Sequence, residues 1–181
     1  MEQRSGALQR FLGGYARLAR LPPPAIAPMA LDEHLRRVRR LIASDRVRLL
    51  PSQPLRVMAD ADQLEQVLIN LLRNALEADT GGAEVVVRCA RDGDLARIEI
   101  VDRGPGLPVS DNLFVPFFTT KPGGSGIGLV LSRQIIESQH GSLRLQPRED
   151  APGSVASVHL PVAPSAVPAG ELRTDSRYHP Q

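Results

Sequence analysis

Residues 62–78 restrict the possible folds more than any other segment, because their apolar residues follow helical spacing without interruption. Intervals of three and four residues place apolar side chains on one face of an α-helix. The apolar positions are Leu64, Val67, Leu68, Leu71, Leu72, Ala75 and Leu76. Gln66, Asn70 and Asn74 are spaced by four and share a ridge away from that face. This pattern predicts a helix that packs on a core and presents three amides on another side.

Shorter elements surround this helix in an order that indicates the fold class. A helix is predicted at 31–43, two short strands at 46–50 and 55–58, and a hairpin of strands at 84–89 and 96–101. A glycine- and proline-rich loop at 102–126 leads into a helix ending near 139, and strands at 142–146 and 154–160 follow. The order predicts an α+β fold, a two-layer sandwich with helices on one face of a mixed, mostly antiparallel sheet.

The chain is expected to hold one folded domain with appendages at both ends. A length of 181 residues with 42% hydrophobic content suits a single core. A short amphipathic helix at 7–21 is stopped by Pro22, Pro23 and Pro24, and residues 25–30 are predicted to be a linker. The main domain is expected at 31–161. Residues 162–181 are rich in Pro, Ala and Ser without a period, which predicts a disordered tail.

Composition excludes several classes of protein. Cys89 is the single cysteine, so neither an internal disulfide nor a cysteine-based metal site can form, and a reducing cytoplasm is expected. No apolar stretch approaches the roughly 18–20 residues that cross a bilayer. The net charge of +2 is too small to indicate a nucleic-acid partner, and the arginines of the first quarter fit a solvated helical face.

Two polar elements suggest nucleotide chemistry, although each is common in other settings. The amide oxygens of Asn70 and Asn74 suit Mg²⁺, which prefers oxygen ligands, but exposed asparagines on helices are frequent. Asp102 follows a predicted strand and precedes Gly104 and Gly106. A carboxylate there can accept a hydrogen bond from the exocyclic amine of adenine, although such a motif alone is more often a turn.

A glycine-rich segment at 123–129 opens the helix that follows it. Glycines leave backbone N–H groups free at a helix N-terminus, which favours polyphosphate. The segment is neither a Walker A loop nor a dinucleotide fingerprint, because no Gly-Lys-Ser/Thr follows and no strand precedes. Just before it, residues 114–121 hold three of the four phenylalanines and the only lysine, Lys121. These aromatic side chains either dock on another helical bundle or fill the domain's own core.

Taken together in this order and spacing, the four elements resemble the N, G1, F and G2 boxes of sensor histidine kinases. The similarity covers roughly residues 31–161 and is closest to the nitrogen-regulation type. It implies the Bergerat ATP-binding fold shared with gyrase, mismatch-repair and heat-shock chaperone ATPases, with ATP and Mg²⁺ as ligands. The candidate site residues that it implies are Asn70, Asn74, Asp102, Gly104, Gly106, Lys121, Gly124, Ser125, Gly126, Ile127, Gly128 and Leu129.

The resemblance also implies a role for most of these residues. Asn74 would hold Mg²⁺ and Asn70 would lie near the phosphates, while Asp102 would read adenine between Gly104 and Gly106. A lid hinge would form at Gly124, Gly126 and Gly128, and Lys121 would contact phosphate or the Mg²⁺ site. The ATPase branches place a glutamate at the position of Asn70, and an amide cannot act as a general base. Glu77 stands where some members carry a basic residue.

The N-terminal region departs from the family. A helix bearing His followed by Glu or Asp and then Pro is absent, and residues 1–24 resemble only the second half of a dimerisation hairpin. His34, His140, His159 and His179 are each interpreted as structural or solvated. The acceptor histidine is therefore expected outside this chain, on a dimerisation domain, with a response regulator as the later partner and any membrane attachment through a preceding region.

Two other functions remain open from the sequence. The first is a serine kinase of the anti-sigma-factor type, which uses the same fold. The second is a catalytically silent module that binds a nucleotide or docks on a kinase dimer. The leading prediction is a histidine kinase catalytic domain that donates the γ-phosphoryl group of ATP.

Overall fold

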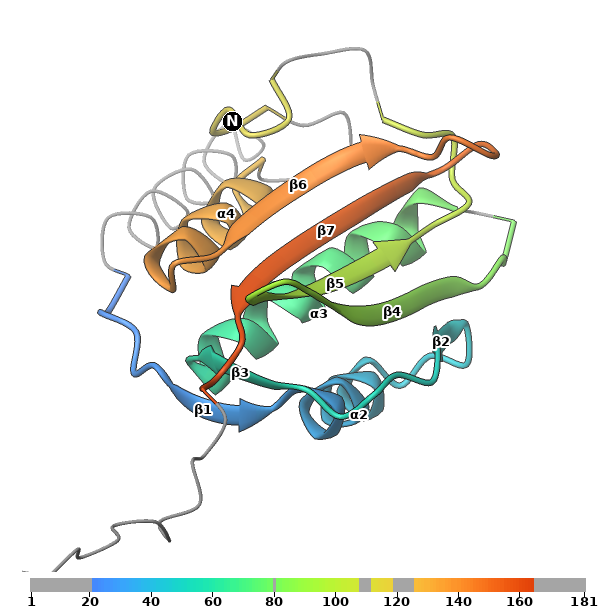
Figure 1. Cartoon of the computed structure of the whole chain (residues 1–181). Coiled ribbons are helices and arrows are strands. Elements are labelled where there is room, and N and C mark those ends of the chain that lie inside the picture. The colour runs from blue at the N-terminus through green and yellow to red at the C-terminus, as the bar shows by residue number, and fades with distance from the viewer. Residues whose placement is uncertain (1–20, 80, 108–111, 119–125, 165–181) are drawn as a thin grey trace, which may run out of the picture.

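A five-stranded sheet with order β2-β4-β5-β7-β6 forms one layer of the molecule (Figure 1). The computed structural model describes residues 21–79, 81–107, 112–118 and 126–164. The strands of this sheet are β2 (Val47–Leu49), β4 (Val85–Asp92), β5 (Leu95–Val101), β6 (Ser142–Pro147) and β7 (Ser154–Pro161). All neighbours pair antiparallel except β2 and β4, which are parallel.

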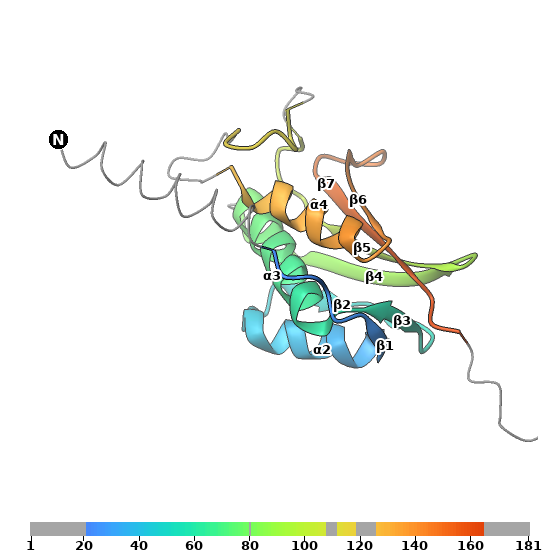
Figure 2. The same ribbon diagram turned by 90° about the vertical axis from the view of Figure 1, so that its left-hand side faces the viewer.

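Three helices make the second layer, α2 (Leu31–Ile42), α3 (Ala61–Ala78) and α4 (Gly128–Ser138). Figure 2 shows all three on the same side of the sheet. The predicted α+β sandwich is confirmed. Within the described ranges, no helix is both long and apolar enough to cross a membrane.

Strand alternation explains why the helices cover one face only. On β5 the side chains of Ala96, Ile98 and Ile100 are buried toward the helices, as are those of Val158 and Leu160 on β7. Alternate residues on the same strands point to the other face. Helix α3 supplies the other half of the core through its apolar stripe. Apolar side chains of the sheet and of the helix are buried against each other, and this contact holds α3 on the sheet.

The segment predicted to be a linker contains a strand. β1 (Ala27–Ala30) pairs antiparallel with β3 (Arg56–Ala59) in a separate two-stranded sheet. Asp60, which caps α3 by accepting a hydrogen bond from Gln63 N, also accepts one from Ala25 N at 2.8 Å. The segment before α2 is therefore fixed to the start of α3 instead of linking freely.

The two short strands predicted on either side of Pro51 and Pro54 exist but do not form a hairpin with each other. β2 joins the edge of the main sheet beside β4, and β3 pairs with β1. Arg46, just before β2, donates hydrogen bonds to the carbonyl groups of Leu76, Asp79 and Ala83 and to the Asp79 carboxylate. This side chain therefore ties the end of α3 to the segment that enters β4.

The C-terminal part predicted to be disordered begins with ordered residues. Val162 N donates to Asp94 O at 2.9 Å, and Ala163 N donates to Arg56 O at 2.8 Å. Val162 also bridges Val57, and Ala163 is buried. These contacts join the small sheet to the large one, so the folded part extends to Pro164. The predicted helix at 7–21, apart from Leu21, and the tail from residue 165 lie outside the described residues.

Candidate nucleotide site

Asn70 lies where α3 meets the first turn of α4. Its Nδ2 donates a hydrogen bond to the Ser132 hydroxyl at 2.9 Å. A Cβ at Gly128, the first residue of α4, would lie 2.6 Å from Asn70 Oδ1. Glycine at 128 therefore allows the amide to lie directly against the start of α4.

The ridge on α3 continues from Asn70 through Asn74 to Ala78, each one turn further along. Asn74 is half-buried. At the end of the ridge, a Cβ at Gly104 would lie 2.9 Å from both the Cβ and the carbonyl oxygen of Ala78. The loop after β5 thus packs directly on the last turn of α3. The structure thereby brings the asparagine ridge and the Asp102 motif to one end of the helix.

Asp102 is 5% exposed and its carboxylate is held in place by hydrogen bonds. Its Oδ1 accepts from Gly104 N at 2.9 Å and from Ser154 N at 3.1 Å, and its Oδ2 accepts from the Ser154 hydroxyl. A buried carboxylate must be paired in this way to offset its loss of hydration. Each carboxylate oxygen has more than one acceptor position, so the fixed group can accept a further hydrogen bond from a ligand.

Two glycines shape the surroundings of Asp102. Gly106 has φ +91°, a backbone conformation that other residues rarely adopt. Gly153, in the β6–β7 hairpin, has φ +129°, and a Cβ there would overlap the Asp102 carbonyl oxygen. The hairpin therefore lies against the Asp102 loop and forms one wall of the site.

Ser132, Gly153 and Ser154 were not predicted from the sequence. Ser154 begins the last strand directly after a glycine, and this Gly-Ser pair before a strand is the signal that could have drawn attention to it. Its bond to Asp102 joins residues 52 positions apart. Ser132 occupies a buried position on α4 among apolar residues, and nothing in the local pattern distinguishes it.

The N-terminus of α4 is open in the part that the structure describes. Ile127 precedes the helix without a side-chain cap, is buried, and anchors the first turn, while Leu129 packs half-buried against the core. The first N–H groups of a helix have no partner within the helix. Gly126 has φ +64°. Lys121, Gly124 and Ser125 lie outside the described residues.

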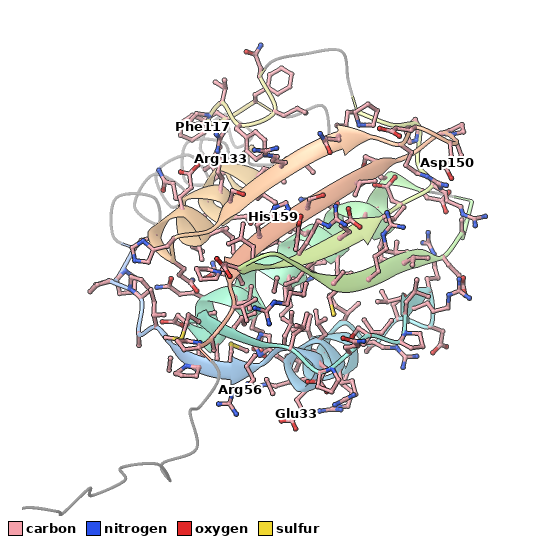
Figure 3. All side chains as sticks on the ribbon, viewed as in Figure 1. Glu33, Arg56, Phe117, Arg133, Asp150 and His159 are labelled. Carbon is pink, nitrogen blue, oxygen red and sulfur yellow. The ribbon has the colours of Figure 1, made fainter. Side chains whose placement is uncertain are left out.

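The aromatic run is divided between the domain's own core and its surface. Phe114 packs against the core, and the Arg133 guanidinium of α4 lies 4.8 Å from its ring centre. Phe117 is 36% exposed and Val115 is 46% exposed. Figure 3 shows Phe117 and Arg133 near each other at one end of α4. Phe114 therefore holds the segment against α4, while Val115 and Phe117 expose apolar surface to solvent.

Three of the four histidines predicted to be structural or solvated lie in the described residues, and His179 lies outside them. His34 is buried on α2, and burial lowers its pKa below the ordinary value against the opposing charge of Glu65. His140 occupies an exposed turn with φ +61°, and His159 lies on β7. In the described ranges, no three His, Cys, Asp or Glu side chains form a metal cluster.

Comparison with known proteins identifies the family. The family described as histidine kinase-, DNA gyrase B- and HSP90-like ATPase matches residues 59–164. The chain belongs to this family. The match includes the asparagine ridge, the Asp102 motif and the start of α4, so the geometry above is that of an ATP-binding catalytic domain. The match thus confirms the resemblance noted in the sequence.

The relatives of this family member are sensor histidine kinases. The C4-dicarboxylate transport sensor protein DctS of Rhodobacter capsulatus is 45% identical over 119 residues, covering 62% of this chain and 18% of DctS. The sensory histidine kinase/phosphatase NtrB of the same species is 33% identical over 168 residues, covering 78% of this chain and 45% of NtrB. The chain therefore spans less than half the length of either relative.

Solved structures agree. The mycobacterial sensor histidine kinase MprB superposes with a TM-score of 0.63 at 30% identity, covering 77% of this chain and 99% of that one. The histidine kinase ThkA, in complex with the response regulator protein TrrA, gives 0.71 at 26% identity, covering 91% of this chain and 50% of ThkA. Neither the serine-kinase nor the silent-module alternative is favoured by these similarities.

Proposed function

We propose that this ATP-binding domain uses Mg²⁺ with ATP and transfers the γ-phosphoryl group to a histidine on a region outside this chain. The supporting observation is an amide, Asn70, placed against the start of α4. An amide cannot take a proton from water, so the site lacks at this position the general base that hydrolysis needs. Phosphoryl transfer depends mainly on positioning and charge neutralisation, and a partner can supply the nucleophile.

The adenine end of the site is proposed to be Asp102. The exocyclic amine of adenine would donate to its carboxylate, whose position is fixed by Ser154 and Gly104. Guanine has a carbonyl oxygen at the position of this amine. Because this oxygen and the Asp102 carboxylate are both hydrogen-bond acceptors, guanine would be disfavoured. Gly104 and Gly106 would let the base approach the backbone.

The phosphate end is proposed to be the α4 N-terminus beside the asparagine ridge. The first turn of α4 has no side-chain cap and, because Gly128 lacks a Cβ, lies directly against the Asn70 amide; its backbone N–H groups fit a group that carries negative charge. Asn74, with its amide oxygen, would hold Mg²⁺, and the ion would neutralise charge on the phosphates. Gly124, Gly126 and Gly128 would hinge the lid, with Lys121 and Ser125 contacting phosphate.

The partners are proposed from the same family membership. A dimerisation domain bearing the acceptor histidine would present it to the bound ATP, and residues 1–24 would correspond to the second half of its hairpin. A response regulator would then take the phosphoryl group, as the complex of ThkA with TrrA suggests for that protein. The domain would work in the cytoplasm, attached to a membrane only through a preceding region.

Calorimetry of ATP binding, with and without Mg²⁺, tests the site, and labelling of a supplied histidine-bearing hairpin domain tests the transfer. Asp102→Asn should abolish ATP binding. Asn74→Asp should change the difference in ATP affinity between solutions with and without Mg²⁺. Asp94→Asn, an exposed carboxylate in the β4–β5 turn, is the matched control and should bind normally. Absence of ATP binding by the unaltered domain would refute the proposal; binding without transfer to any hairpin would refute the transfer alone.

A further inference from the structure

The face of the large sheet that points away from the helices carries an ordered set of charged side chains. In the cross-strand register, Ser157 of β7 lies between Glu99 of β5 and Arg144 of β6. The next outward residue on β7, His159, lies between Arg97 and Ser142. Figure 3 shows His159 on β7, in front of the helical layer. In the described residues, no helix covers this face (Figure 2).

Positive charge exceeds negative charge at this place. Glu99 is bonded to Arg88 at 2.6 Å and is only 3.9 Å from the Arg97 guanidinium. Arg144 is exposed and makes no hydrogen bond or ion pair with any described residue. Two carboxylates, Glu99 and Asp92 at the end of β4, therefore face three arginines, which leaves about one positive charge uncompensated before the imidazole is counted.

The longer side chains beside Ser157 lie over the strand, because this serine is only 5% exposed although it points to the open face. Ser157 is buried at the floor, and neighbours directly across a strand pair are about 5 Å apart. Arg97 and Arg144 therefore rise from the strands on either side of β7, each long enough to reach over it. His159 Nδ1 is shielded from solvent and has no hydrogen-bond partner in the described part of the chain, so one polar atom of this group is still unsatisfied.

We propose that Arg97, Arg144, His159 and Ser157 form a binding site for a phosphoryl group on the open face of the sheet. The guanidinium groups present paired donors to phosphate oxygens, a geometry that suits arginine better than lysine. The Ser157 hydroxyl lies beneath, and the imidazole adds a donor and a charge when protonated. With His159 protonated, the uncompensated charge rises to about two, which matches a phosphate dianion, whereas a carboxylate would neutralise only one.

The site is distinct from the nucleotide site already described. The asparagine ridge of α3 lies on the helical side of the sheet, and Asp102 lies beyond the end of β5. Arg97 and His159 pair with each other nearer the opposite end of β5. A substitution at Asp102 therefore removes the first site without touching the second.

Proton binding is coupled to this second site. Burial and the charges of Arg97 and Arg144 lower the pKa of His159, opposed by Asp92 at the end of β4 and Glu99 of β5. A bound phosphate adds negative charge beside the ring and raises this pKa. By linkage, protonation of His159 favours phosphate binding, and bound phosphate favours protonation of His159.

NMR titration of the His159 imidazole in the whole chain tests the proposal, with inorganic phosphate as the probe and sodium chloride at matched ionic strength as the screening control. We expect phosphate, but not chloride, to shift the His159 signals and raise its pKa. Arg144→Gln should weaken this response by about tenfold, as expected for loss of one charge-assisted contact. Arg36→Gln, at an exposed position of α2, is the matched control and should leave the response of His159 to phosphate intact.

A second arm identifies the source of the phosphoryl group. ATP added to the Asp102→Asn variant reports on the sheet face alone, and a His159 shift there would show that a nucleotide tail also fits. A shift with phosphate only would restrict the site to the free ion. An equal effect of chloride and phosphate, or an unchanged response in both Arg144→Gln and Arg97→Gln, would overturn the proposal.

Discussion

Substituting Gly128 by Ala should weaken ATP binding while leaving the free energy of unfolding nearly unchanged. The new Cβ would lie 2.6 Å from Asn70 Oδ1, where ordinary contact begins at 3.4 Å, so the amide must move by about 0.8 Å. The atom that must move is the far end of a side chain, which can rotate without disturbing the backbone. We therefore expect Asn70 to swing away from α4.

The cost to folding should be small because two effects oppose each other. Displacing Asn70 removes its hydrogen bond to Ser132, which contributes about 0.5–1.5 kcal/mol. Alanine in a helix is favoured over glycine by up to about 1 kcal/mol. The free energy of unfolding should change by less than about 1 kcal/mol. Under the proposed role of Asn70 beside the phosphates, its displacement should weaken ATP binding by about tenfold or more.

Urea unfolding and calorimetry of ATP binding measure the two quantities on one preparation. Asn70→Ala alone should weaken ATP binding similarly, and adding Gly128→Ala to it should have no further effect, because the displaced group is gone. Gln134→Ala, exposed on the same helix, is the control. Additive losses in the double variant, or unchanged ATP affinity in Gly128→Ala, would show that Asn70 is not the group through which this glycine acts.

Three further predictions follow from contacts described above. Gly153→Ala should destabilise the domain by at least about 1–3 kcal/mol, because φ +129° and the overlap with the Asp102 carbonyl leave no room; thermal unfolding measures this. Arg46→Ala should cost about 1–3 kcal/mol in urea unfolding, since it leaves carbonyl groups at the end of α3 without a donor, and an unchanged midpoint would refute the role. Because the pKa of His34 is lowered in the folded state, the unfolded chain takes up a proton at a higher pH than the folded chain. The free energy of unfolding should therefore fall as the pH drops below about 6.5. In His34→Gln, the free energy of unfolding measured across this pH range should change less.

Local patterns predicted the elements whose burial depends on their own periodicity. Helix α3 was expected at 62–78 and spans Ala61–Ala78, because its apolar stripe meets the core along its full length. The hairpin of β4 and β5 was expected for the same reason. The Asp102 motif and the start of α4 were predicted to be parts of one site because glycines accompany both in the sequence.

Contacts between residues far apart in the sequence could not be predicted from local patterns. Strand β1 contains a proline and no apolar alternation, and it is a strand because β3 lies beside it. The parallel pairing of β2 with β4 joins two segments that no turn signal connects. Ser154 reaches Asp102, and Ser132 reaches Asn70, only after the tertiary fold has formed.

The strand order has a consequence for how the chain is made. Among the described strands β7 comes last in the sequence, yet it lies between β5 and β6 and pairs with both along nearly its whole length. A chain growing on the ribosome therefore carries β5 and β6 as separate unpaired edges until residues 154–161 emerge, and such edges invite pairing with other chains. The sheet closes only once β7 has been made, so premature termination within β7 should yield an aggregating chain, not a slightly shorter domain.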